Sequence, residues 1–168
     1  MKKRMRFLMM VIVSFVLFGF ARPVLAISES QKTAIVENCE VIRENLKTVQ
    51  HQDSRTRVYL GRYYETILSK YITPLNVRLV ENTMINSDLM DNQDSFSRTR
   101  NSFIIDFIEY QKGLEDLVAT DCRVEPEIFY NKLVKVRERR KVVESDTVVL
   151  KELIMTQLNL VKGLREQL

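Results

Sequence analysis

The stretch PEIFYNKLVKVRERRKVVESDTVVLKELIMTQLNLVKGLREQL, residues 126–168, decides the fold of this chain. Its seam residues recur at alternating steps of four and three through six heptads without a skip, and this spacing predicts one long amphipathic helix. The stretch opens with proline, which suits the first turn of a helix because the N–H that proline lacks would have no partner there. The seam consists of Phe129, Leu133, Val136, Arg140, Val143, Thr147, Leu150, Ile154, Gln157, Val161, Leu164 and Leu168.

Two further helices are expected before this one, over residues 30–72 and 95–121. Only three glycines and two prolines follow residue 26, so few places can turn the chain and long helices are the default. The predicted fold class is therefore all-α, a long antiparallel three-helix coiled-coil-like bundle. Asp53 and Thr56 form a polar layer in the first seam, and Tyr63 is expected in the core. The first seam is Ile35, Cys39, Ile42, Leu46, Val49, Asp53, Thr56, Leu60, Tyr63 and Ile67, and the second is Phe96, Phe103, Phe107, Tyr110, Leu114 and Leu117.

The segment between the first two helices is expected to form the tip of the bundle. Thr73 suits the N-cap position and Pro74 the first turn, so a short or frayed helix is predicted over 74–81. Residues 82–95 contain six Asn and Asp residues and form the best loop candidate. The alternative is a frayed helix, because apolar residues in this segment keep the heptad phase.

The first 26 residues have the pattern of a secretory signal peptide. A basic stretch, MKKRMR, precedes about fifteen uncharged residues, and small residues stand at the −3 and −1 positions before a cut after Ala26. The alternative is an uncleaved membrane anchor, but a spanning helix needs roughly 20 apolar residues. We therefore expect an extracytoplasmic protein (periplasmic, surface-exposed or secreted) that meets the membrane only through this signal during export.

Two cysteines, Cys39 and Cys122, remain in an oxidising compartment, and an even count there favours one disulfide. Free or intermolecular thiols are the alternative. A sharp hairpin at Thr73 would leave the cysteines 34 and 49 residues from the turn, roughly 22 Å out of step by helical rise. A disulfide cannot span that distance. An irregular tip over 73–95 is therefore predicted to absorb the excess.

Removing the signal changes the charge of the chain. Five of the 26 basic residues and none of the 22 acidic ones lie in 1–26, so residues 27–168 carry 21 basic and 22 acidic side chains. No excess positive charge is left to attract phosphate, which argues against nucleic acid as a partner. The 142 residues suffice for a single domain.

The residue types that carry catalysis or bind metals are sparse. The single histidine, His51, stands in a polar stretch and is expected to be solvated, since a zinc site needs three or four clustered ligands. Asp88, Asp91 and Asp94 step by three through the tip, but a calcium loop usually needs a glycine turn, and none is present. We expect no catalytic, cofactor or metal site.

Surface positions with interface chemistry are the remaining candidates. Tyrosine offers apolar area with a polar tip, so Tyr59 and Tyr64, which flank Tyr63, are candidates for a partner interface. The basic run of residues 137–141 could bind an acidic partner, although a solvated helix face is the plainer interpretation. The predicted interface set is Tyr59, Tyr64, Asp88, Asp91, Asp94, Arg137 and Arg139.

Residues 52–76, 103–122 and 125–143, with the sequences QDSRTRVYLGRYYETILSKYITPLN, FIIDFIEYQKGLEDLVATDC and EPEIFYNKLVKVRERRKVV, resemble a group of uncharacterised exported helical proteins of small-genome bacteria. This resemblance covers most of the chain after residue 26 and implies no activity. The architecture also resembles small periplasmic holdase chaperones, which are usually strongly basic, unlike residues 27–168.

These features favour an exported, non-enzymatic binding or scaffolding protein of the cell envelope that contacts a protein partner or associates with itself. A holdase-like chaperone or a surface adhesin that uses the tip, residues 82–95, is the alternative. An enzyme would need titratable groups that converge in a pocket between helices, and the sequence nominates no such set.

Overall fold

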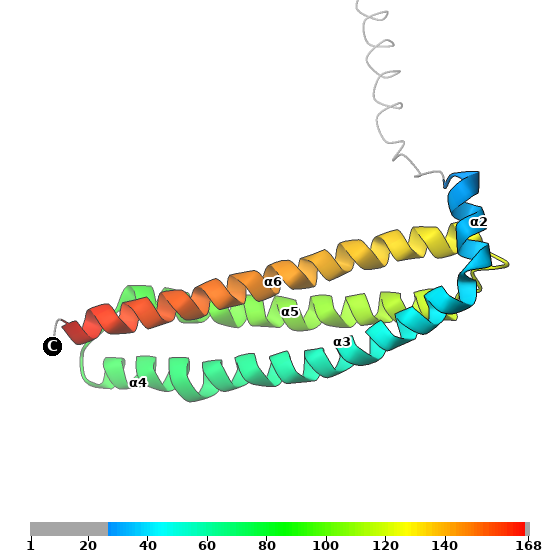
Figure 1. Ribbon diagram of the computed structural model, residues 1–168. Coiled ribbons are helices and arrows are strands. Elements are labelled where there is room, and N and C mark those ends of the chain that lie inside the picture. The colour runs from blue at the N-terminus through cyan, green and yellow to red at the C-terminus, as the bar shows by residue number, and fades with distance from the viewer. Residues whose placement is uncertain (1–26, 167–168) are drawn as a thin grey trace, which may run out of the picture.

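The computed structural model describes residues 27–166. All secondary-structure elements in this range are helices, and none is a strand (Figure 1). The all-α prediction is confirmed, whereas the predicted signal peptide lies outside the described residues. No helix in this range is long and apolar enough to cross a membrane. The elements are α2 (Glu29–Glu37), α3 (Cys39–Ile67), the π-helix η1 (Leu68–Ile72), α4 (Thr73–Glu81), α5 (Ser87–Ala119) and α6 (Pro126–Glu166).

The first arm of the molecule is divided at Asn38, where a single helix over 30–72 was expected. The Asn38 backbone leaves the helical region, with φ −102° and ψ 14°, and its side-chain amide donates to the carbonyl of Ala34 at 2.9 Å. Asparagine competes for backbone partners in this way and so favours helix ends. Figure 1 shows the resulting bend, after which α3 runs along the body of the molecule.

The tip is more regular than the sequence predicts. Thr73 is itself helical, with φ −61° and ψ −48°, so α4 continues from η1 and Thr73 is no N-cap. The loop is confined to residues 82–86, and α5 begins at Ser87, where the Asn86 side chain accepts the N–H of Leu89 at 3.1 Å. A proline crowds the helical turn before it and removes a donor, and the wider π-helical turn of η1 accommodates that change. The expectation of an irregular tip over 73–95 is therefore wrong.

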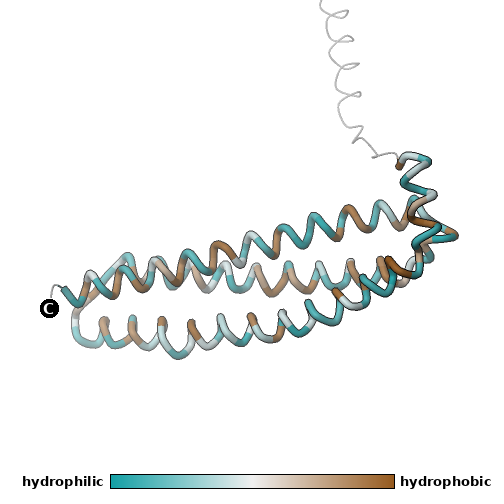
Figure 2. Tube along the Cα trace, in the orientation of Figure 1, coloured by the Kyte–Doolittle hydropathy of each residue, from teal (hydrophilic) through white to brown (hydrophobic). Residues whose placement is uncertain are grey.

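Helix α5 is the centre of the bundle and packs against both α3 and α6. All six residues of its predicted seam are buried, as are Phe129, Val136, Val143 and Leu150 of α6, spaced by heptads. Figure 2 shows hydrophobic and hydrophilic residues alternating along each helix, as expected where one face of each helix is buried.

The core departs from the predicted seam at one position of α3. Tyr64 is 3% exposed and its ring packs edge-on against Phe103 at 5.4 Å, whereas Tyr63 is 44% exposed. The expectation that Tyr63 is core is therefore wrong. At 100° per residue, Tyr64 points about 20° from the direction of Cys39, but Tyr63 points about 120° away. A seven-residue repeat drifts around a straight helix, and the buried position moves by one residue.

A disulfide joins Cys39 to Cys122, with their Cα atoms 5.6 Å apart, so the predicted bridge is confirmed. It ties the start of α3 to the turn before α6. The chain reverses at residues 82–86, which lie closer than Thr73 to the midpoint of the sequence between the two cysteines. This position of the turn brings the two cysteines level without a long loop.

Candidate functional site

A groove runs between α3 and α6, because both helices pack on α5 but pack little against each other. Two adjoining cavities of about 350 Å³ each lie along it and share Thr147 and Val148. Phe107 and Tyr110 of α5 contribute to the first cavity. We call this surface the α3–α6 groove. Its other lining residues are Asp53, Thr56, Leu60, Tyr63 and Tyr64 of α3 and Arg140, Val143, Glu144, Lys151, Ile154 and Met155 of α6.

A polar cluster occupies the first cavity. The Tyr110 hydroxyl donates to the carboxylate of Asp53 at 2.6 Å, and the Arg140 guanidinium lies 3.9 Å from the same carboxylate and 3.7 Å from that of Glu144. Burial raises the pKa of the Tyr110 hydroxyl, and its hydrogen bond to Asp53 raises the pKa further. Tyr110 therefore stays a neutral donor, and Arg140 lies near both acidic side chains of the groove.

The rim of the groove is apolar and open. Val148 is 55% exposed and Met155 is 51% exposed, one heptad apart on α6, and Tyr63 faces them from α3. Residues one heptad apart lie about 10.5 Å apart along a helix, which is two turns of a docked helix. Lys151 stands between them, and none of the described carboxylates lies within 4.0 Å of its ammonium group. The groove thus offers an apolar stripe with one unpaired positive charge.

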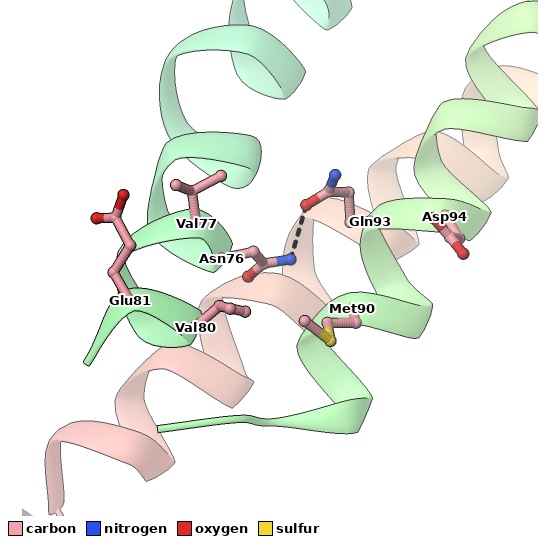
Figure 3. A pocket seen from close by; sticks show the side chains of 7 residues that line it. All are labelled: Asn76, Val77, Val80, Glu81, Met90, Gln93 and Asp94. Atoms are coloured by element: carbon pink, nitrogen blue, oxygen red, sulfur yellow. Dashed lines mark hydrogen bonds between the residues drawn. The ribbon is translucent and has the colours of Figure 1, made fainter. Parts of the chain in front are cut away.

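The tip carries a second hollow, of about 450 Å³, between α4 and α5. Val77, Val80 and Met90 form its apolar part, and Asn76 and Gln93 lie behind them (Figure 3). The Asn76 amide donates to the Leu89 carbonyl at 3.0 Å and to Gln93 Oε1 at 2.8 Å. We call this surface the tip notch; Glu81 and Asp94 also line it. Sequence reasoning missed Asn76 because a single asparagine among apolar residues does not reveal whether its side chain is buried or solvated.

The predicted interface residues at the tip and on α3 differ in how far they are exposed. Tyr59 is 69% exposed and is available to a partner, whereas Tyr64 is 3% exposed and lines the base of the α3–α6 groove. Tyr64 therefore does not present an open ring on the helix surface, for the same angular reason that exposes Tyr63. Asp88, Asp91 and Asp94 are exposed on the first turns of α5, in a helix instead of a loop, and only Asp94 lines the tip notch.

The basic run on α6 is spread around the helix. Arg137 is exposed, whereas Arg139 donates to the Glu109 carbonyl at 2.8 Å and lies 3.6 Å from the Glu109 carboxylate. Arg140 points into the groove. The structure therefore does not gather these side chains into one patch, and Arg139 supports the packing of α5 against α6.

A pair of carboxyl groups, Asp106 of α5 and Asp146 of α6, meets between these helices. Burial raises the pKa of Asp146, and the charge of Asp106 raises it further, to about 6. No sequence pattern indicates this pair, because the two residues lie 40 positions apart and neither belongs to a predicted seam.

Ionisable side chains meet in the first cavity of the groove and at the Asp106–Asp146 pair. His51 is exposed on α3, and residues 27–166 hold no cluster of three or more His, Cys, Asp or Glu side chains that could bind a metal ion. Neither a family model, nor a curated protein, nor a solved structure matches this chain. The α3–α6 groove offers apolar contact over two helical turns, with polar groups at its base.

Proposed function

We propose that this chain is an exported, non-enzymatic binding or scaffolding protein of the cell envelope, a long antiparallel coiled-coil-like bundle that holds a partner helix in its α3–α6 groove. The observation that carries this proposal is the apolar rim of that groove. Four-helix bundles bury such a rim with a fourth helix, and amphipathic helices dock into apolar grooves through anchors at i, i+3, i+4 and i+7.

The occupant is an amphipathic helix of another protein that carries an acidic residue beside its apolar anchors. Arg140 lies near both Asp53 and Glu144, whereas Lys151 lacks a carboxylate partner among the described residues. An acidic side chain opposite Lys151 would give its ammonium group a partner. A second copy docked with Lys151 on the two-fold axis would place Lys151 against Lys151, which is unfavourable.

Export rests on two observations of different kinds. The first 26 residues have the charge and apolar pattern of a signal peptide. The disulfide between Cys39 and Cys122 fits an oxidising compartment, because cytosolic thiols are kept reduced. Together they support a location outside the cytoplasm.

The test places a photo-cross-linking residue at position 155 in the producing cell and identifies the cross-linked segment by mass spectrometry. We expect an amphipathic helix with an acidic flank. A synthetic peptide of that segment should bind the purified protein and bind the Val148→Glu/Met155→Glu variant about tenfold or more weakly, because two charges enter an apolar contact.

The control variant is Val142→Glu/Val149→Glu. These valines are also exposed on α6 and one heptad apart, but they do not line the groove. This variant should bind the peptide as the unmodified protein does. Equal cross-linking from positions 149 and 155, or equal loss of binding in both variants, would refute the assignment to the groove.

A further inference from the structure

Two surfaces of this chain that do not line the groove have complementary chemistry. The first is the tip notch. The second is the outer face of α3, which we define as Arg55, Val58, Tyr59 and Arg62, all of them exposed. The tip notch carries an unpaired hydrogen-bond acceptor and negative charge, and the outer face of α3 carries a hydrogen-bond donor and positive charge.

The tip notch contains a buried acceptor without a donor. Asn76 is 6% exposed, and its Oδ1 has no hydrogen-bond partner among the described residues. The orientation of the amide is determined by the Leu89 carbonyl, which can only accept and must therefore face the Asn76 Nδ2. Val80 and Met90 lie beside this amide in Figure 3. The amide oxygen points toward Val80 in Figure 3, so an incoming donor would reach Oδ1 beside Val80.

The outer face of α3 presents an exposed donor on an apolar ring. Tyr59 stacks on Tyr63 with ring centroids 6.4 Å apart, and its hydroxyl has no hydrogen-bond partner in the described range. A tyrosine that offers apolar area and a polar tip suits an interface in which its hydroxyl finds an acceptor. Arg55 and Arg62 stand four residues before and three residues after it, on the same side of the helix.

The charges of the two surfaces are opposite. Residues 73–95 carry one arginine against Glu81 and three aspartates, a net charge of −3. Residues 51–62 carry three arginines against Asp53, a net charge of +2, and Asp53 itself bonds to Tyr110 of α5. No ion pair within 4.0 Å involves Arg55, Arg62, Glu81 or Asp94 in the part of the chain that the structure describes.

We propose that the tip notch of one copy binds the outer face of α3 of a second copy. Tyr59 of the second copy enters between Val77, Val80 and Met90, and its hydroxyl donates to Asn76 Oδ1. Arg55 and Arg62 then face the acidic side chains on the two sides of the notch, Glu81 and Asp94, which Figure 3 shows on either side of it.

This contact joins two different surfaces, so a pair of copies keeps one free tip notch and one free α3 face. Such a heterologous contact repeats from copy to copy and yields a ring or an open chain. The contact area is small, and we therefore expect weak, concentration-dependent association. The inference goes beyond the docking of a partner helix, because neither surface belongs to the α3–α6 groove.

Sedimentation velocity of the purified, oxidised protein tests the proposal at concentrations up to about 1 mM, where weak interfaces associate. We expect a sedimentation coefficient that rises with concentration. The Arg55→Glu/Arg62→Glu and Glu81→Lys/Asp94→Lys variants should each remain monomeric, and the variant with all four changes should associate again. A protein that stays monomeric at every concentration, or double variants that associate as the unmodified protein does, would overturn the proposal.

Tyr59 variants test the anchor itself. Tyr59→Phe keeps the ring but removes the donor, and it should weaken association about three- to tenfold; Tyr59→Ala should abolish it. Tyr71→Ala is the matched control, because Tyr71 is exposed to nearly the same extent and lies outside both surfaces. Association that survives Tyr59→Ala, or that Tyr71→Ala reduces equally, contradicts the assignment. The Val148→Glu/Met155→Glu variant should associate normally, which separates this contact from the proposed groove.

Discussion

Replacing Asp146 by asparagine is expected to stabilise the protein at neutral pH. Asp146 and Asp106 bring two carboxyl groups together between α5 and α6, and Oδ2 of Asp146 is buried without a hydrogen-bond donor among the described residues. Burial raises the pKa of Asp146 first, and the charge of Asp106 raises it further, to about 6 from an ordinary 3.8. At neutral pH Asp146 is largely charged and is repelled by the charge of Asp106 in a partly buried site.

The size of the effect follows from the difference in pKa between the folded and unfolded chains. Each pKa unit corresponds to about 1.4 kcal/mol, so two units set an upper bound of about 3 kcal/mol. Because the Asp146 side chain is still partly open to solvent, screening reduces this to about 1 to 2 kcal/mol.

The direction in which stability changes with pH follows from proton binding. Since the pKa of Asp146 is raised by folding, the folded chain binds more protons than the unfolded chain between the two pKa values. The destabilisation by Asp146 is small below pH 3.8, grows between pH 3.8 and about 6, and is constant at higher pH. Asparagine cannot ionise, so Asp146→Asn removes this destabilisation at neutral pH and changes little in acid.

Urea unfolding of the oxidised protein at about pH 4 and about pH 7.5 provides the assay, with the free energy of unfolding compared between variants at each pH. Asp146→Asn should gain stability at the higher pH only. The control is Glu152→Gln, which removes one exposed carboxylate from the same helix and should change stability by less than about 0.5 kcal/mol. An equal gain at both pH values, or no gain at the higher one, would refute the carboxyl-pair explanation.

Further predictions concern the core and the disulfide. Replacing Cys39 and Cys122 with serine opens a loop that the bridge closes across 83 residues, and urea unfolding should show a loss of about 4.5 kcal/mol by loop-closure entropy. Tyr64→Ala should cost about 3 to 5 kcal/mol because it leaves a cavity, whereas Tyr63→Ala should cost less than about 1 kcal/mol, measured by the same method. Gln157→Leu removes one hydrogen-bond partner of the buried Asn92 amide on α5. It should lower stability by about 1 to 3 kcal/mol, visible as a lower Tm.

Much of the fold can be predicted from the spacing of apolar residues. The heptads of α5 and α6 are unbroken, and Phe103, Phe107 and Leu150 are buried as their positions predict. The disulfide is predicted by the cysteine count together with the export expected from residues 1–26. The prediction failed in α3, where a seven-residue repeat was extended over 25 residues of a helix with 3.6 residues per turn. The angular difference accumulated along the helix, so that Tyr64 is buried in place of Tyr63.

The tip shows a different limit of sequence reasoning. Thr73-Pro74 has the local signature of a helix start, yet the chain passes through it in a continuous helical run. Whether a proline ends a helix or widens the turn before it depends on what the neighbouring turns pack against. Ile72 and Asn76, on either side of Pro74, are both buried. If the helix stopped there, Ile72 would become exposed to water and Asn76 would lose its hydrogen-bond partners. Tertiary packing outweighs the local signal.

The candidate groove is harder to predict, and the reason can be seen on a single helix. Helix α6 has two pairs of exposed apolar residues one heptad apart: Val142 with Val149, and Val148 with Met155. Nothing in their spacing or chemistry distinguishes the pairs. Only the second lies beside the hollow between α3 and α6, because α3 packs on α5 from that side. The position of α3 depends on the bend at Asn38 and on the bridge to Cys122, so a binding surface on α6 is determined by residues far from it in the sequence.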